Sequence, residues 1–180
     1  GPGARDGAPG QGPDVGGPHG PYFQTQRLEL YREQATRLIR DGHAYRCYCS
    51  KDDLQRAREA FASTGTKDQF RYPGTCRDKP DEPNRPHVVR FRSPSTGVTA
   101  FEDLVRGRIE VPNSAQQDFV LLRTDGVPLY NFGAVVDDVT MDVNLIARGD
   151  DHIVNTPPQL LLYDALKYPR PTIAHLPMIL

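Results

Sequence analysis

The sequence predicts an α/β protein whose last third belongs to a parallel sheet. Two observations predict this fold class. Residues 144–147 and residues 176–180 are each typical of a short apolar strand. Between them a helix is expected, because Thr156 can cap it, Pro157 fits the first helical position and Gln159 completes a capping box. Strand, helix and strand in this order form a βαβ unit, which brings parallel strands into one sheet.

The composition fits one globular domain, or a domain with an insertion. The chain has 180 residues, of which 37% are hydrophobic, enough to bury a core. No apolar run is long enough to span a membrane, and no signal peptide is recognised at the start. Three cysteines cannot all pair, and two of them are separated by a single residue, so a reducing, cytoplasmic location is expected.

The charge pattern gives little guidance about partners. The net charge is −1, so no global basic signal points to nucleic acid. Only four of the 22 basic residues are lysines. Arginine suits bidentate contacts with carboxylates and phosphates, although a GC-rich genome explains the same excess.

The N-terminal part is predicted to be a flexible lead followed by two helices. Residues 1–21 contain 13 glycines and prolines and almost no apolar side chains. Residues 24–40 repeat apolar side chains at helical spacing. A second helix is expected after Ser50, with Asp53 as a weaker capping-box partner. Prolines and glycines then predict a loop over residues 64–86.

Short strands are predicted in the middle of the chain. They are expected at residues 87–92, 97–101, 105–111 and 118–122, the last buried and followed by a turn at Asp125-Gly126.

Arg148 is the strongest candidate for a ligand-binding residue. It follows a predicted strand, at the edge of an α/β sheet where ligands bind. Its guanidinium can hold a carboxylate through two parallel hydrogen bonds, and Tyr130 can add a phenolic donor. The N-terminus of the following helix would offer free amides to the same anion. The alternative is a structural ion pair between Arg148 and one of four nearby aspartates, Asp137, Asp138, Asp150 and Asp151. Side-chain chemistry alone favours neither.

The acidic clusters also suggest a metal site, which we consider weaker. Oxygen ligands for Mg²⁺ or Zn²⁺ are available from Asp137, Asp138 and Asp142, or from Asp150, Asp151 and His152. Adjacent residues on a regular element point in different directions, and the first three acids lack i, i+4 spacing. Helix capping and solvation therefore explain most of these side chains better.

A second candidate metal site involves all three cysteines. Cys47 and Cys49 form one hook, and Cys76 and Asp78 form another 27 residues further on. Three thiolates and one carboxylate would satisfy tetrahedral zinc, and a structural metal suits a loop-rich segment without its own core. The spacing is not the common C-x₂-C, so three partly buried cysteines without metal are the alternative.

Several motifs together resemble bacterial glutamyl-tRNA synthetases, which are class I aminoacyl-tRNA synthetases. The resemblance extends from about residue 12 to residue 180. It rests on the segments 12–18 (GPDVGGP), 72–77 (YPGTCR), 101–107 (FEDLVRG), 130–138 (YNFGAVVDD), 148–159 (RGDDHIVNTPPQ) and 174–177 (AHLP).

This resemblance implies a Rossmann-type catalytic domain interrupted by an acceptor-stem-binding α+β insertion. The lead would cover residues 1–21 and the end of the first Rossmann half residues 22–46. The insertion, with its zinc site, would cover residues 47–113, and the second Rossmann half residues 114–180.

The resemblance also implies an activity and its partners. The whole enzyme would activate L-glutamate with ATP and Mg²⁺, transfer it to the 3′ end of tRNA(Glu), and act as a monomer. Tyr130 and Arg148 match positions that recognise glutamate, and Asp151 and His152 match a segment lining the pocket for ATP and the tRNA end. The family's zinc pattern matches Cys47, Cys49, Cys76 and Asp78, although its fourth ligand is usually His, Cys or Tyr.

The departures from the family pattern predict a fragment. No H-I-G-H-like motif occurs in the chain, and the K-M-S-K-like motif is expected beyond residue 180. Three alternatives therefore stay open: the glutamyl-queuosine tRNA(Asp) synthetase paralogue, a non-catalytic tRNA-binding or zinc module, and a metal-dependent phosphohydrolase. The module would use arginines of the insertion, such as Arg85, Arg90 and Arg92, against phosphates.

We predict that the 180-residue chain alone does not activate glutamate. The missing motifs bind the ATP phosphates and stabilise charge in the transition state. ATP–pyrophosphate exchange measured with glutamate and tRNA(Glu) should give no turnover above a no-enzyme control. Robust exchange by the isolated chain would contradict the prediction.

Overall fold

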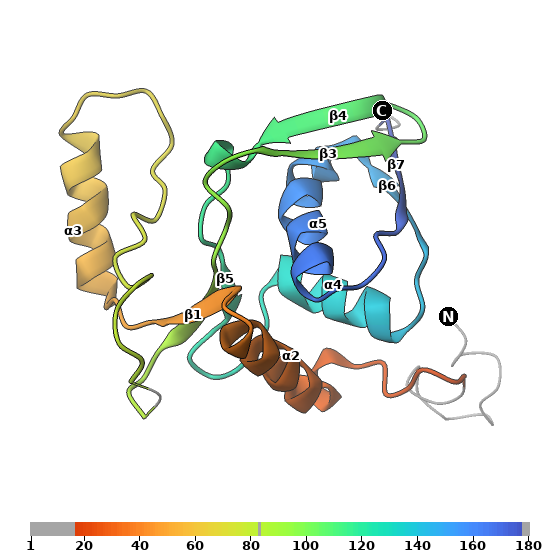
Figure 1. The fold of residues 1–180 in the computed structure, drawn as a ribbon, viewed down its shortest axis with the longest axis horizontal. Helices are drawn as coiled ribbons and strands as arrows, with labels where there is room; N and C mark the ends of the chain where they lie inside the picture. Colours follow the sequence, from red (N-terminus) through yellow and green to blue (C-terminus); the bar gives the residue numbers. More distant parts are fainter. Residues whose placement is uncertain (1–16, 83, 178–180) are drawn as a thin grey trace.

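The computed structural model describes residues 17–82 and 84–177. Its helices are η1 (Gln24–Gln26), α2 (Leu28–Arg40), α3 (Lys51–Ala62), η2 (Asn113–Ala115), α4 (Tyr130–Thr140), η3 (Asp150–Asn155) and α5 (Thr156–Ala165). Its strands are β1 (Ala44–Cys47), β2 (Val88–Phe91), β3 (Val98–Asp103), β4 (Gly107–Pro112), β5 (Val120–Leu122), β6 (Leu145–Gly149) and β7 (Thr172–Leu176). Figure 1 shows these elements in order of sequence.

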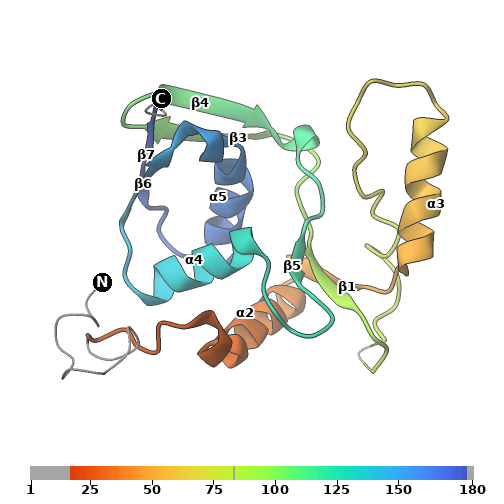
Figure 2. The same cartoon turned by 180° about the vertical axis from the view of Figure 1, so that it is seen from behind.

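The two N-terminal helices confirm the predictions. Helix α2 buries one face through Tyr31, Ala35 and Leu38, as its spacing indicates. Helix α3 begins after Ser50, whose side chain accepts from the Asp53 amide while the Asp53 carboxylate accepts from the Ser50 amide. Helix α3 has no buried residue, and Figures 1 and 2 show it at the far side of the molecule from α4 and α5.

The seven strands of the described residues form two small sheets. One is antiparallel, in the order β1-β2-β5. The other has the order β4-β3-β7-β6, in which the β3–β4 hairpin is antiparallel while β3 pairs with β7, and β7 with β6, in parallel. The predicted βαβ unit is therefore present as β6, α5 and β7. Its register places Arg148 of β6 beside His175 of β7.

Both sheets share one hydrophobic core. Helices α4 and α5 pack on one another and lie inside the curve formed by the second sheet and α2 (Figures 1 and 2). Fully buried side chains from three helices and β5 meet there, among them Tyr31, Phe132, Tyr163 and Leu121. A smaller second cluster contains Tyr45, Cys47, Tyr72 and Cys76, so the cysteine region has its own packing centre.

The last strand lies earlier than predicted. We expected it at residues 176–180, but β7 covers Thr172–Leu176 and Pro177 lies outside it. Proline lacks the N–H group that a paired strand residue donates, so the strand ends before Pro177 instead of continuing through it. Residues 178–180, like residues 1–16 of the predicted lead, lie outside the described residues.

Helix α4 was not predicted, and the prediction for the start of α5 was wrong. Residues 130–138 were expected to carry functional side chains but no element was assigned, although Phe132, Val135 and Val136 form a buried helical stripe on α4. The predicted capping box at Thr156 does not form. Asn155 is the N-cap residue of α5, no side-chain cap bond is made, and Gln159 instead donates to Asn131.

The sheets do not separate along the predicted domain boundaries. Strands β3 and β4 fall in the expected insertion, residues 47–113, yet β3 pairs with β7 of the expected second Rossmann half. Conversely, β5 lies beyond residue 113 but pairs with β2. Residues 47–113 are thus joined to the residues that follow them by backbone pairing in both sheets.

In the part of the chain that the structure describes, no helix is sufficiently long and apolar to cross a membrane.

Candidate functional site

Arg148 is held at the end of β6 by neutral acceptors. Its Nε–H donates to His175 Nε2 at 3.2 Å, and its Nη2 donates to the Thr156 hydroxyl at 2.7 Å. The Thr156 hydroxyl itself lies 3.1 Å from His175 Nε2. Thr156 is fully buried at the start of α5, so its hydroxyl fixes the arginine instead of capping the helix.

Behind this contact lies a buried histidine–carboxylate pair. His175 Nδ1 is 2.6 Å from Asp103 Oδ2, and both side chains are completely buried. Asp103 is the last residue of β3, and its carboxylate also accepts the backbone N–H groups of Val105, Arg106 and His175. Burial would raise the pKa of the Asp103 carboxyl, but these hydrogen bonds outweigh it and lower that pKa to about 2.

Among the described residues, Arg148 forms no ion pair with a carboxylate. Each aspartate that was considered as its partner makes its hydrogen bonds or close contacts with other residues, although the charge of Arg148 still acts on Asp138. Asp137 binds Arg27 and Tyr31, Asp138 accepts from Tyr163, Asp150 pairs with Arg106, and Asp151 lies beside His152. The alternative of a structural ion pair at Arg148 is therefore not what the chain adopts.

These contacts also bear on the proposed acidic metal sites. Within the described ranges, the grouping of potential metal ligands contains cysteines alone. Asp137 contacts Arg27 and Tyr31, Asp138 contacts Tyr163, and Asp142 lies beyond the end of α4 with a φ of 56°.

The start of α5 is less suited to an anion than its sequence indicates. Pro157 and Pro158 occupy the first turn and have no N–H group, and residues 156–160 are all buried. Two of the four amides that a helix N-terminus usually offers are therefore missing.

Tyr130 and His152 lie together, with Asp151 beside them. Tyr130 is the first residue of α4 and is 54% exposed, and its hydroxyl lies 3.5 Å from His152 Nδ1. His152 belongs to η3, which directly follows β6, and its Nε2 is 3.7 Å from Asp151 Oδ2. The imidazole and the carboxylate thus follow the end of the strand that carries Arg148, and the exposed phenol at the start of α4 lies beside the imidazole.

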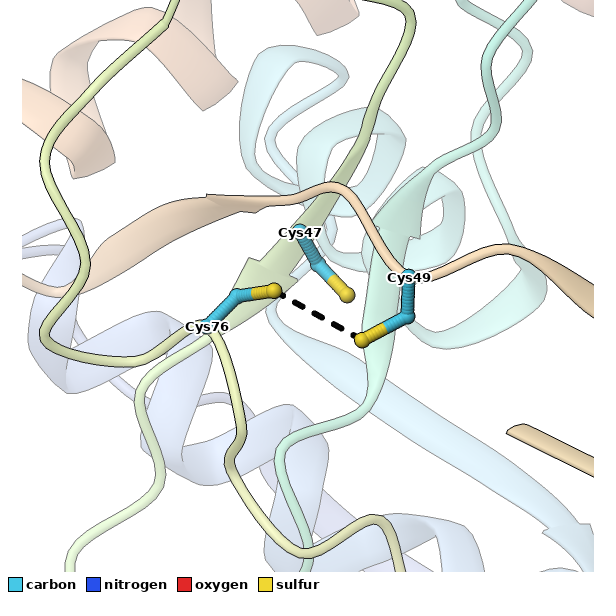
Figure 3. A group of neighbouring side chains, drawn as sticks. All are labelled: Cys47, Cys49 and Cys76. Atoms are coloured by element: carbon cyan, nitrogen blue, oxygen red, sulfur yellow. Dashed lines mark hydrogen bonds between the residues drawn. The ribbon is translucent and has the colours of Figure 1, made fainter. Parts of the chain in front are cut away.

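The three cysteines converge as their sequence spacing suggested. Figure 3 shows Cys47, Cys49 and Cys76 pointing toward one another, and their sulfur atoms all lie within 4.8 Å of one another. Cys47 and Cys49 come from the end of β1 and the residues after it, and Cys76 from the long loop after α3. Cys49 Sγ is 3.6 Å from Cys76 Sγ.

The fourth group at the thiols is Tyr72, not Asp78. The Tyr72 hydroxyl lies 3.3 Å from Cys47 Sγ and 3.6 Å from Cys49 Sγ. Asp78 is 84% exposed at its side chain and accepts from Arg92, so the predicted ligand set is corrected at this position. The C-x-D spacing does not determine where the Asp78 side chain points, because Cys76 and Asp78 lie in a turn and not in a regular helix or strand.

Hydrogen bonds and a nearby positive charge favour the ionised form of one thiol in this cluster, that of Cys47. The guanidinium of Arg90, a residue only 8% exposed, lies over the Tyr72 ring at 3.8 Å, so this arginine is not available for phosphate contacts. Burial would raise the pKa of the Cys47 thiol, but hydrogen bonds with Tyr72, Cys49 and Arg90 outweigh it and lower that pKa. For Cys49, burial dominates and raises the pKa to about 11.

Sequence reasoning missed Asp103, His175 and Tyr72 as site residues. A histidine inside an otherwise apolar strand, His175, was a usable signal, because buried imidazoles require partners on both nitrogens. Asp103 ends a strand before a tight turn, which favours a turn-capping role alone. Only the pairing of β3 with β7 brings the two together.

Comparisons with known proteins identify the chain's relatives. Residues 10–180 match the family described as tRNA synthetases class I (E and Q), catalytic domain. The chain is 65% identical over 170 residues to the glutamate–tRNA ligase of Anaeromyxobacter sp. strain Fw109-5, a match covering 94% of this chain and 36% of that protein. It is 52% identical over 162 residues to the Geobacter sulfurreducens glutamate–tRNA ligase, covering 89% and 34%.

A solved structure has the same fold. The glutamate tRNA ligase of Elizabethkingia meningosepticum, described in complex with its amino acid, matches with a TM-score of 0.85 at 28% identity. The match covers 96% of this chain and 37% of that one. The chain thus spans about a third of the length of these relatives. It belongs to the family of class I tRNA synthetase (E and Q) catalytic domains.

Proposed function

We propose that the full-length protein carrying this chain is a glutamate–tRNA ligase, which activates L-glutamate with ATP and transfers it to tRNA(Glu). The identity to glutamate–tRNA ligases over nearly the whole chain supports this reaction. The observation that carries the assignment of the amino-acid site is the guanidinium of Arg148, which has no carboxylate partner among the described residues. A cytoplasmic, monomeric enzyme is the corresponding expectation.

The free end of the Arg148 side chain suits the γ-carboxylate of glutamate. A guanidinium carries five N–H donors in a fixed fork. His175 and Thr156 occupy the edge formed by Nε and Nη2, which leaves Nη1 and the second Nη2 hydrogen. Those donors can hold a carboxylate by two parallel hydrogen bonds.

This arrangement would also reject close analogues. A glutamine amide offers one acceptor oxygen and places N–H groups against a cation, and an apolar side chain offers nothing. A partly buried arginine left without its acceptor costs more than the loss of apolar contact does, so discrimination is strong.

Tyr130, Asp151 and His152 would complete the pocket. We assign to the Tyr130 phenol a further donor to the substrate, and to Asp151 and His152 the wall that faces ATP and the 3′ end of tRNA. Their support is the family resemblance, together with the closeness of Tyr130 to His152 and the direct continuation of β6 into η3.

Replacing Arg148 by alanine in the full-length protein should raise the KM for glutamate by about 30-fold to several thousandfold, because truncating a buried charged partner costs about 2–5 kcal/mol. The KM for ATP should change little. Steady-state aminoacylation with saturating tRNA(Glu) measures both, and Arg123→Ala, which removes an exposed arginine paired with Asp125, is the matched control. A glutamate KM within about twofold of the unmodified protein would remove Arg148 from the amino-acid site.

The cysteine cluster is proposed as a structural zinc site. The residues fit the metal, because three sulfur atoms converge and a phenolic oxygen stands at the fourth side. Cys47, Cys49, Cys76 and Tyr72 would hold the ion, and Arg90 would offset the charge of the thiolates. Bound zinc would tie the long loop to β1, in a region whose helix α3 buries no side chain.

Metal content tests this site directly. We expect about one zinc ion per chain by elemental analysis of the purified protein, and thiolate-to-metal absorption when Co²⁺ replaces it. Tyr72→Phe should weaken Co²⁺ binding by at least about tenfold, whereas Asp78→Asn, the exposed control, should leave it unchanged. Equal affinity for both variants would exclude Tyr72, and no binding by the unmodified protein would exclude the site.

A further inference from the structure

Resting on the proposed function, we propose that Asp103, His175 and Thr156 form a buried positioning chain that fixes the Arg148 guanidinium for recognition of glutamate. None of the three would touch the substrate. Each would act through the next residue, from the end of β3, across β7, to the start of α5 and the end of β6.

The chain begins at a carboxylate that stays ionised. Asp103 Oδ1 accepts the backbone N–H groups of Val105 and Arg106, each at 2.9 Å, and Oδ2 faces His175 Nδ1 at 2.6 Å. Three backbone donors hold a buried carboxylate in its charged form. An ionised Oδ2 accepts only, so the proton between the two residues resides on His175 Nδ1.

This fixes the tautomer of the imidazole. With the proton on Nδ1, neutral His175 presents a lone pair at Nε2. That lone pair accepts from the Nε–H of Arg148, and the Thr156 hydroxyl lies 3.1 Å from the same nitrogen. The opposite tautomer would point an N–H at the Arg148 Nε–H, with two donors 3.2 Å apart and no acceptor between them.

Thr156 supplies the second point of attachment. Its hydroxyl oxygen accepts from Arg148 Nη2 and lies within hydrogen-bonding distance of His175 Nε2. Two attachments on one edge of a planar group determine its plane as well as its position. The guanidinium then presents its other edge without rearrangement, which is how prepositioned donors improve specific binding.

The same carboxylate connects the arginine to a turn outside the amino-acid site. Oδ1 of Asp103 holds the turn between β3 and β4, and Arg106 of that turn pairs with Asp150 of η3 at 2.6 Å. The turn is therefore connected to Arg148 and its neighbours by two routes, through Asp103 and His175 to Arg148, and through the Arg106–Asp150 ion pair to η3. Loss of the Asp103 charge should disturb the Arg148 guanidinium more than the turn, because only the route through His175 depends on the imidazole tautomer.

The test uses Asp103→Asn and Thr156→Val in the full-length protein, with aminoacylation kinetics at saturating tRNA(Glu). In Asp103→Asn the amide oxygen can still accept from the turn, but its NH₂ group faces His175 and favours the wrong tautomer. Thr156→Val keeps the shape and removes the hydroxyl. We expect each variant to raise the KM for glutamate by about 10- to 100-fold, the size of one lost hydrogen bond to a charged group, with the KM for ATP nearly unchanged.

Rescue and control variants separate positioning from folding. Thr156→Ser restores the hydroxyl and should return the glutamate KM to within about threefold of the unmodified protein. Glu102→Gln removes an exposed carboxylate from the neighbouring position of β3 and should have no effect on either KM. If Asp103→Asn fails to fold, the comparison of Thr156→Val with Thr156→Ser alone tests the positioning chain.

The outcomes distinguish this inference from the proposed function. If Arg148→Ala raises the glutamate KM while Thr156→Val leaves it unchanged, Arg148 stays in the site and the positioning chain is refuted. Parallel increases in the KM for glutamate and ATP, or no rescue by Thr156→Ser, would also refute it, since they indicate general disturbance. If Arg148→Ala itself has no effect, the proposed function of the site fails.

Discussion

The arrangement around the end of β6 depends on one interaction, in which the Arg148 guanidinium donates to two neutral acceptors and not to a carboxylate. A buried or half-buried arginine in a protein this rich in aspartate is normally neutralised by one of them. Here the aspartates on α4 and η3 bind Arg27, Tyr163 and Arg106. The negative charge nearest to Arg148 along the hydrogen-bond chain is Asp103, which is separated from it by the His175 ring. The guanidinium is therefore fixed in position and yet still retains its charge for a ligand.

This arrangement depends on the second sheet and on α5. The chain of contacts uses the end of β3, the middle of β7, the end of β6 and the first residue of α5. These elements lie far apart in sequence, and only the parallel pairing of β3, β7 and β6 brings them side by side. The β3–β4 hairpin, which the family resemblance assigned to the insertion, is thus part of the framework that holds Arg148.

Local pattern was enough to predict much of the fold. Amphipathic spacing located α2, the capping box located α3, and the βαβ order predicted β6, α5 and a following strand, which was placed four residues too late. Prediction failed where one sequence pattern is compatible with two structures. Thr156 was interpreted as a helix cap because the local sequence does not show its tertiary partners, Arg148 and His175. Helix α4 was not predicted because polar side chains are interspersed with its apolar stripe. In the metal cluster, Cys-x-Cys spacing identified the thiols, whereas a turn directs Asp78 away and a loop brings Tyr72 in.

A structure of the full-length protein with bound glutamate tests the central claim most directly. The account predicts that the γ-carboxylate lies on Nη1 and Nη2 of Arg148, while Nε and the other Nη2 hydrogen stay on His175 and Thr156. A γ-carboxylate bound by other residues, or an Arg148 side chain that leaves His175 when glutamate binds, would contradict it.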